Sequence, residues 1–440
     1  MSKQPIRIPE IQDNDYSFSE VVGKLTNNIK NIDCEFNKIK DYFNKLNQDK
    51  SHFINSNDIC TPIDCVKEMV DSIPKNFWKK EKLMVLDPCC GNGNFHAYIQ
   101  TKTKLSNLYF NEINQKRIDN LMLYFGNNIN ITKKDYLLFD DTTKYDLIVA
   151  NPPYAKFMHG GQRASKNHNL SREFIKKSLS IVKDNGYILF IVPDNWMSFS
   201  DRNILPREMS NYQFLHINIH GAKKYFPKVG SSFTWFLLQK KENKEKTVIE
   251  NNYIIKENSL TYINKHCKFI PLFYNNIVKN ILDKTIYNEK AKKFNIETTS
   301  FLHRYTKAKN INENKDDKFC YKLIHTPSQT VYSDIPHKFQ DGHKVFISLT
   351  NQYSTFIDKC GMTQSIAFIK CKNKNDALLI KNELDQEIYK FLNNIGRYGN
   401  FNNIRILQSF PRLHEINLTQ EELEFINHFN SKYYHGKKEK

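Results

Sequence analysis

The sequence lacks both the cysteine pattern of a zinc site and the long apolar runs of a membrane span. Its nine cysteines include no Cys-x-x-Cys pair and no matching histidine spacing, so we expect no metal site. The longest apolar runs, such as YILFIVP at 187–193 and FTWFLL at 233–238, fall far short of the ~20 residues that cross a bilayer. An odd number of cysteines without an apolar leader peptide predicts reduced thiols. We therefore expect a cytoplasmic protein, neither secreted nor membrane-spanning, with no disulfide framework.

Acidic residues are outnumbered by basic ones. Lys and Arg total 65 and Asp and Glu total 47, which gives a formal net charge of +18 at pH 7. Such an excess favours a polyanionic partner, although a Lys-rich solvated surface explains it nearly as well. The 31 Phe and 23 Tyr supply rings that can stack on bases, but most of them should belong to the core. The composition thus favours a nucleic-acid partner without establishing one.

The chain has 440 residues, which is too many for one core of ordinary size. Apolar residues spaced by three and four over 16–49 predict an amphipathic helix or a helix pair. Between 83 and 239, short apolar runs alternate with polar helical segments, which predicts a mostly parallel, doubly wound α/β sheet. The charged stretch 240–251 is typical of a linker or a hairpin tip, and we place a domain boundary there.

Three parts are therefore predicted: an N-terminal helical segment over 1–54, an α/β domain over 55–245, and a mixed α+β domain over 246–440. In the last part we expect isolated strands at 344–349 and 365–371, followed by one helix over 374–393.

A glycine-containing loop follows the first predicted strand, in VLDPCCGNGNF at 85–95. Gly91 and Gly93 let the backbone turn tightly and approach a ligand, although a plain strand-to-helix turn explains the loop as well. The loop is not the dinucleotide fingerprint, because His96 stands where that motif needs a third glycine. Asp87 would repel a pyrophosphate and would favour a cationic ligand.

Two further acids follow the next two predicted strands. Glu112 ends the second strand roughly 20 residues after Gly93, where an acid grips ribose hydroxyls. Asp135 ends the third predicted strand and could accept a hydrogen bond from the amine of an adenine ring. Each acid alone is as often a helix N-cap. Together with Asp87 they describe a site for a nucleoside that carries positive charge, and S-adenosylmethionine is the candidate.

The sequence DLIVANPPY at 146–154 places two prolines directly after a buried strand. The prolines forbid both strand pairing and helix, so a stiff loop should present Asn151 and Tyr154 at the carboxyl end of the sheet. The amide oxygen of Asn151 and the carbonyl of Pro152 can accept the two hydrogens of an adenine amine and aim its lone pair at a sulfonium methyl. Tyr154 offers a ring face for a base that has been flipped out of the duplex.

At this point the sequence resembles the S-adenosylmethionine-dependent DNA adenine-N6 methyltransferases of the gamma arrangement, over roughly 55–240. The family segments that it resembles are CTPIDCVKEMV, DPCCGNGNF, NPPY, GYILFIVPDNWM and KYFPKVGSSFTWFLLQK. The resemblance implies a Rossmann-like methyltransferase sheet, S-adenosylmethionine as cofactor, double-stranded DNA as partner, and a target recognition role for the C-terminal domain. It places these residues at the cofactor: Thr61, Asp87, Pro88, Cys89, Gly91, Gly93, Glu112, Asp135, Tyr136 and Asn151. It places these at the target base: Asn151, Pro152, Pro153, Tyr154 and Phe226, the last opposite Tyr154.

Several alternatives remain beside this interpretation. An RNA adenine methyltransferase and a catalytically inactive DNA-binding protein of the same fold stay open, although the intact acids and the intact NPPY argue against lost activity. A protein-glutamine methyltransferase needs no long C-terminal appendage. A cytosine-C5 enzyme is disfavoured because the only Pro-Cys pair lies in the cofactor loop. No nuclease motif stands out, so a restriction endonuclease partner would be a separate chain. For DNA contact we single out GRYGNFNNIR at 396–405.

Overall fold

The structure is a computed structural model, and it describes residues 34–49, 51, 60–138, 140, 142–154, 170–227, 229–230, 232–350 and 352–435. The chain forms two compact units. The first runs to Pro193 and resumes over Ser210–Thr247, and the second joins Asp194–Met209 to the chain from Val248 onward. The chain therefore passes between the units three times. The predicted boundary between 245 and 246 addresses only the last of these crossings.

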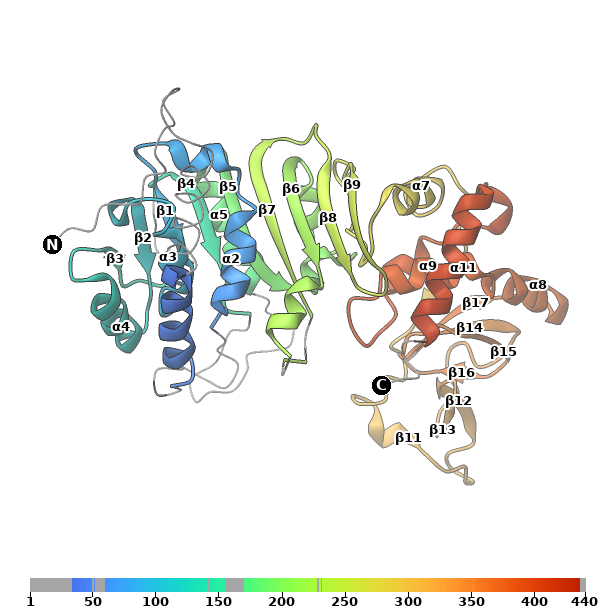
Figure 1. Cartoon of the computed structure of the whole chain (residues 1–440). Helices are drawn as coiled ribbons and strands as arrows, with labels where there is room; N and C mark the ends of the chain where they lie inside the picture. The colour runs from blue at the N-terminus through green and yellow to red at the C-terminus, as the bar shows by residue number, and fades with distance from the viewer. Residues whose placement is uncertain are drawn as a thin grey trace. The chain divides into compact units, whose positions relative to one another are not determined.

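One sheet organises the first unit. Seven of its strands follow one another in the order β3-β2-β1-β4-β5-β7-β6 (Figure 1). They are β1 (Val85–Asp87), β2 (Leu108–Asn111), β3 (Asn130–Thr132), β4 (Tyr145–Ala150), β5 (Val182–Pro193), β6 (Tyr212–Ile219) and β7 (Phe233–Glu242). Strands β1 to β5 pair in parallel, and β7 is antiparallel to both β5 and β6. The prediction of a mostly parallel, Rossmann-like α/β sheet is confirmed.

The order of the strands places a switch point beside β1. This strand pairs with β2 on one side and with β4 on the other, so the chain first adds strands in one direction and then in the opposite one. Open α/β sheets bind their ligands at the carboxyl ends of the strands at such a point. The loops after β1 and β4 are therefore the first place to look for a site.

Helices cover this sheet (Figure 1). They are α2 (Ile63–Asp71), α3 (Asn94–Ile99), α4 (Gln115–Phe125) and α5 (Leu170–Ile181), with short 3-10 helices η2 (Lys75–Lys79), η3 (Leu105–Asn107) and η5 (Gly221–Tyr225). The side chain of Asn114 caps α4 by accepting the amide of Lys116, which satisfies one of the unpaired donors at a helix start.

The described end of the N-terminal segment is helical over 34–46 and belongs to the first unit. Its Phe43 is fully buried, and the ring centroid lies 5.0 Å from that of Tyr124. Phe36 meets Tyr98 at 5.8 Å between centroids. The amphipathic spacing thus predicted a helix that packs on the α/β core. The rest of the predicted helix, over 16–33, lies outside the described residues.

The second unit mixes helices with small sheets, as expected for an α+β domain (Figure 1). Two four-stranded sheets have the orders β10-β17-β14-β15 and β11-β13-β12-β16. The strands of these two sheets are β10 (Glu297–Thr298), β11 (Ile311–Asn312), β12 (Tyr321–Thr326), β13 (Gln329–Ser333), β14 (Lys344–Ser348), β15 (Thr355–Asp358), β16 (Gly361–Met362) and β17 (Ile366–Lys370). The strands β8 (Thr247–Asn252) and β9 (Lys256–Thr261) precede them in the chain and belong to neither sheet. The helices are η4 (Asp194–Met197), α6 (Leu205–Met209), α7 (Asn276–Lys284), η6 (Ala308–Asn310), α8 (Lys374–Leu384), α9 (Glu387–Ile395), α10 (Ile404–Gln408), η7 (Leu413–Glu415) and α11 (Gln420–His435).

Two predictions about local structure were wrong. The single helix expected over 374–393 is two helices, α8 and α9, because Gln386 is extended with ψ of 148°. The stretch 240–251, expected as a linker or a hairpin tip, is mostly strand, since β7 continues to Glu242 and β8 begins at Thr247. Within the described ranges, no helix is long and apolar enough to cross a membrane.

Candidate cofactor and catalytic site

The loop after β1 is shaped by two glycines with positive φ, +57° at Gly91 and +87° at Gly93. A Cβ on Gly93 would lie 2.6 Å from side-chain atoms of both Leu121 and Phe125 on α4, whereas one on Gly91 would meet nothing closer than 3.7 Å. Gly93 is therefore required twice, by its backbone conformation and by the close approach of α4, and Gly91 only by its conformation. In dinucleotide-binding folds, a third glycine allows a helix to pack closely on the loop region. Here Gly93 allows the close approach of α4.

His96, at the position of that third glycine, is a core residue. Its ring is fully buried, and Nε2 lies 2.9 Å from the carbonyl oxygen of Tyr109 on β2. Burial lowers the pKa of His96 to about 4, so the imidazole is neutral at neutral pH.

Asp87 and Glu112 lie at the carboxyl ends of the neighbouring strands β1 and β2. Asp87 is buried, and its Oδ1 accepts the amide of Cys89 at 3.2 Å. Burial, with a smaller contribution from the Glu112 carboxylate, raises the pKa of Asp87 well above its usual value. Two carboxyl groups thus share a poorly solvated space, and a cation placed beside them would relieve the repulsion between them.

Glu112 holds the glycine loop in place. Its Oε2 accepts the amide of Gly91 at 2.9 Å, and its Oε1 accepts the amides of Ile113 and Asn114 at 2.9 Å each. An ionised carboxylate can accept about four hydrogen bonds. These three bonds therefore leave room for one further donor, such as a ligand hydroxyl.

Asn111, which sequence reasoning missed, ties three loops together. Its Nδ2 donates to the carbonyl oxygens of Pro88 at 2.9 Å and of Lys134 at 3.0 Å, in the loops that follow β1 and β3. The signal available was an amide side chain directly before Glu112 at the end of a buried strand.

Asp135 and Tyr136 lie in the loop after β3. The sequence placed Asp135 at the end of the third strand, which was wrong, because β3 ends at Thr132 and Asp135 is exposed three residues later. Its Oδ1 accepts the amide of Leu137 at 3.0 Å. Tyr136 is buried against α5, with its hydroxyl 3.0 Å from Ser178 Oγ.

Asn151 and Thr61 join the loop after β4 to the segment before α2. Asn151 Nδ2 donates to Thr61 Oγ1 at 2.9 Å, and Asn151 Oδ1 accepts the hydroxyl of Tyr154. The carbonyl oxygen of Thr61 accepts Nδ2 of Asn94, at the start of α3, at 2.7 Å. Thr61, which was predicted at the cofactor, thus bridges the glycine loop region and the Asn-Pro-Pro-Tyr loop. The Cys89 thiol also reaches the Asn151 carbonyl oxygen, at 3.7 Å.

Phe233, at the start of β7, lies in contact with both aromatic residues predicted at the target base. Its ring centroid is 5.5 Å from that of Tyr154 and 5.3 Å from that of Phe226. Phe226 and Phe233 are buried, at 5% and 2% exposure, whereas Tyr154 is half-buried. The structure brings Tyr154 and Phe226 into one cluster but not face to face. Sequence reasoning missed Phe233 because it reads as an ordinary residue of a buried strand.

Pro152 and Pro153 differ in burial, since Pro152 is buried and Pro153 is exposed. Residues 155–169 lie outside the described residues, so the described part of this loop ends at Tyr154. Burial raises the pKa of Tyr154, and its hydroxyl therefore stays protonated and can donate.

Glu68 is a third residue that sequence reasoning missed. It lies on α2, and its carboxylate accepts Asn218 Nδ2 at 3.0 Å, Trp235 Nε1 at 3.2 Å and the Tyr225 hydroxyl at 2.7 Å. It also pairs with Lys224. These contacts fix the segment η5 that leads into Phe226. Across the described ranges, no group of three His, Cys, Asp or Glu side chains is arranged to hold a metal ion.

Comparison with known proteins gives matches to methyltransferases. Residues 23–226 match the model of the Eco57I restriction-modification methylase family. The Type II methyltransferase M.AccI of Acinetobacter calcoaceticus is 30% identical over 134 residues, which cover 27% of this chain and 25% of the relative. A tRNA1(Val) (adenine(37)-N6)-methyltransferase of Glaesserella parasuis is 34% identical over 76 residues, 16% of this chain and 32% of that protein.

Among solved structures, a protein of Listeria monocytogenes described as a putative class I S-adenosylmethionine-dependent methyltransferase has a TM-score of 0.40 and 18% identity, covering 48% of this chain and 70% of that one. The chain spans only a quarter to two fifths of the length of the first curated relatives that it matches. Residues 23–226, slightly less than half of the chain, thus match the Eco57I restriction-modification methylase family, which confirms the resemblance to restriction-modification methyltransferases indicated by the motifs.

Proposed function

We propose that this chain is a site-specific DNA methyltransferase that transfers a methyl group from S-adenosylmethionine to the N6 amine of an adenine in double-stranded DNA. One observation carries the proposal. Asn151 follows the buried strand β4, its Nδ2 is held by Thr61, and its Oδ1 is turned towards Tyr154, beside the glycine loop that Glu112 holds. The match of residues 23–226 to a restriction-modification methylase family supports the same assignment.

The residues of the site fit S-adenosylmethionine better than a dinucleotide. Asp87 and Glu112 are buried carboxyl groups that repel each other. Their site therefore suits a cationic sulfonium ligand and disfavours a pyrophosphate. Glu112 retains capacity for a ribose hydroxyl after its three amide contacts. The cofactor supplies an electrophilic methyl group when it is bound. Pro88, Cys89, Gly91 and Gly93 would line the loop against it, and Asp135 with Tyr136 would lie towards its adenine.

The chemistry assigned to the Asn-Pro-Pro-Tyr loop is that of oriented acceptors. The Asn151 Oδ1 and the Pro152 carbonyl oxygen each accept one hydrogen of the target amine, so the nitrogen lone pair is freed from the ring and directed away from the loop. Because the Tyr154 hydroxyl donates to the same Oδ1, the target amine competes with it on entry. Pro153 and Pro152 keep the loop stiff while this exchange takes place.

The target base would be flipped out of the duplex, since an amine inside a base pair cannot reach this loop. Tyr154 offers the stacking face, and Phe226 supports the pocket through Phe233, which touches both rings. The chain's net charge of +18 suits a polyanionic partner. We assign target recognition to the C-terminal domain, 246–440, and expect any restriction endonuclease partner to be a separate chain.

The experiment that tests the function is a nucleoside analysis. The purified chain is incubated with labelled S-adenosylmethionine and plasmid DNA from a host without adenine methylation, and the digested nucleosides are separated. We expect label in N6-methyladenine of DNA, and an initial rate of labelling lower by ~10²–10³ with Asn151→Ala. No label in DNA would contradict the proposal.

A second candidate is an RNA adenine methyltransferase. It is favoured by the 34% identity to the tRNA1(Val) (adenine(37)-N6)-methyltransferase of Glaesserella parasuis over 76 residues. The same incubation with total transfer RNA distinguishes the two, because label in RNA at a higher rate than in duplex DNA would favour this alternative.

A further inference from the structure

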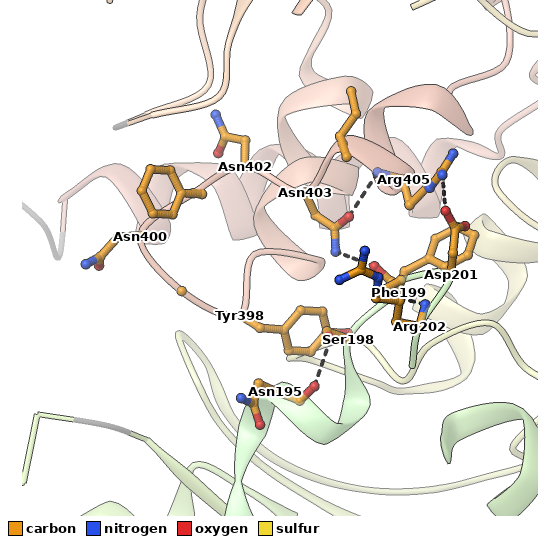
Figure 2. A pocket seen from close by; sticks show the side chains of 14 residues that line it. Asn195, Ser198, Phe199, Asp201, Arg202, Tyr398, Asn400, Asn402, Asn403 and Arg405 are labelled. Carbon is orange, nitrogen blue, oxygen red and sulfur yellow. Dashed lines mark hydrogen bonds and ion pairs between the residues drawn. The ribbon is translucent and has the colours of Figure 1, made fainter. Parts of the chain in front are cut away.

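The second unit contains a cavity of about 530 Å³ that is built from two segments distant in sequence, 195–202 and 398–405 (Figure 2). The first segment leaves β5 through η4, and the second connects α9 to α10. Although 195–202 lies between strands of the catalytic sheet in sequence, it belongs to the same compact unit as 398–405. The cavity is therefore a feature of the second unit alone.

The two walls are fastened to each other. Asn403 Nδ2 donates to the carbonyl oxygen of Phe199 at 3.0 Å, and Arg405 forms an ion pair with Asp201 (Figure 2). Arg405 also donates to Gln408 Oε1 at 2.8 Å, which fixes the guanidinium against α10. The separation of the walls is thus set by the fold before any ligand arrives.

The loop at the rim is anchored from behind. Asn402 is buried, and its side-chain Nδ2 donates to the carbonyl oxygen of Ser348 at 2.8 Å. Its backbone N–H donates to the carbonyl oxygen of Leu349 at 2.9 Å. Phe401 pairs its backbone with Thr350. Because the backbone of this loop is already fixed, little loop entropy is lost on binding. More of the free energy of its contacts is then available for affinity.

What this rigid loop presents to solvent is an aromatic ring and an amide. Phe401 is 68% exposed, an unusual position for a large apolar side chain on an anchored loop, and Asn400 next to it is exposed as well. Asn195 is exposed on the opposite wall. Side-chain amides pair with base edges in the major groove, and apolar groups contact thymine methyls or wedge between bases.

The charges of the cavity favour bases over phosphates. Asp201, Arg202 and Arg405 are the charged residues of its lining, and Asp201 is engaged with Arg405. The net charge of +1 on the lining is compatible with a polyanion nearby. Sites that bind phosphates use several cationic contacts, which this cavity does not offer. The rest of the lining consists of amide, hydroxyl and aromatic side chains together with Ile404 and Gly399.

We propose that this cavity is a base-reading site for duplex DNA, in which Asn400 and Phe401 contact bases other than the target adenine and so help to set the recognition sequence. The proposal rests on the proposed function and deepens it. It assigns part of the recognition surface to 195–202, a segment that precedes the last strands of the catalytic sheet in sequence.

The first test compares methylated sequences. The chain and its variants are expressed in a host without adenine methylation, and long-read sequencing gives the methylated motif of each. Asn400→Ala and Phe401→Ala should retain methylation but accept a wrong base at one position, with discrimination there reduced about tenfold or more. Matched controls are Asn382→Ala and Leu379→Ala, which remove an exposed amide and an exposed apolar side chain from α8. Motifs and rates unchanged from the parent in both cavity variants would overturn the proposal.

The second test is independent of turnover. Phe401 is replaced by the photoreactive analogue p-benzoylphenylalanine, and Leu379 is replaced likewise as a control. After irradiation with a plasmid fragment that contains the methylated motif, we expect a protein–DNA crosslink from position 401 and none from 379. No crosslink from 401, although the protein still binds that fragment, would refute the base contact. A parent chain that neither methylates nor binds duplex DNA would instead refute the proposed function, and this inference with it.

Discussion

Thr61→Val is the substitution that most sharply separates two roles of one hydroxyl. Thr61 Oγ1 accepts Asn151 Nδ2 at 2.9 Å, so the hydroxyl orients the amide whose oxygen is proposed to accept the target amine. The family resemblance places the same residue at the methionine end of the cofactor. Valine has nearly the same shape as threonine, and the substitution therefore removes the hydroxyl while it keeps the packing of this buried position.

The magnitude follows from the bond that is lost. Removing one partner of a buried hydrogen bond costs about 1–3 kcal/mol when the other partner stays unsatisfied. If about 1.4 kcal/mol of this is felt in the transition state, the single-turnover rate falls roughly tenfold. This loss is smaller than the ~10²–10³ expected when the acceptor itself is removed.

The assay measures three quantities on the same preparations: the single-turnover methylation rate, the dissociation constant of S-adenosylmethionine and the melting temperature. A positioning role predicts a slower rate, a cofactor affinity within about threefold of the parent, and recovery by Thr61→Ser, which restores the hydroxyl. In an Asn151→Ala background, Thr61→Val should have no further effect on the rate, because the group that it orients is gone.

Two results would refute this reasoning. The first is a weaker cofactor affinity with an unchanged single-turnover rate, which would place the hydroxyl at the cofactor only. The second is a full additional rate loss in the Asn151→Ala background, which would show that Thr61 acts independently of the amide.

Four other predictions concern the same unit. Asn151→Ala should lower methyl transfer by ~10²–10³ while binding of S-adenosylmethionine, followed by calorimetry, is largely kept, and a rate within tenfold of the parent would contradict its role. Glu112→Ala should raise the dissociation constant of S-adenosylmethionine by about tenfold or more and leave DNA affinity in a gel shift nearly unchanged. Phe226→Ala should slow transfer to a paired adenine more than to a mismatched one if it supports the base pocket, whereas an equal loss with a large melting shift, from a core cavity of ~3–5 kcal/mol, would make it a core residue only. Gly93→Ala should lower stability in urea by about 1–3 kcal/mol more than Gly126→Ala, because both glycines have φ of +87° but only a Cβ at Gly93 meets other atoms; equal losses would show that the contact with α4 is unimportant.

The sheet could be predicted from the sequence because its strands are written as continuous apolar runs. The strand β4 and the stop after it are both explicit, since Leu147, Ile148 and Val149 are fully buried and prolines follow. The glycine loop was predictable because it directly follows the apolar run of β1. The short strand β3 was not predictable, because its residues Asn130–Thr132 are exposed or half-buried and carry no apolar run. The third acid was therefore placed at a strand end that lies elsewhere.

The contacts that organise the site were beyond sequence reasoning for a different cause. Asn151 and Thr61 are 90 positions apart, and Glu68 reaches Trp235 over 167 positions, so no local pattern couples them. A helical spacing also does not show where a helix breaks. The apolar period continues from α8 into α9, and only the extended backbone of Gln386 separates them.

The excursion of Asp194–Met209 into the second unit constrains how this protein can be recombined. A chimaera that exchanges only the chain after Thr247 would combine a foreign 398–405 segment with the original 195–202 segment. Unless the donor happened to match, the Asn403 to Phe199 bond and the Arg405 to Asp201 pair would be lost at the junction. If the cavity reads bases as proposed, new specificities require the transfer of two separate stretches of chain, one of them between β5 and β6 in sequence.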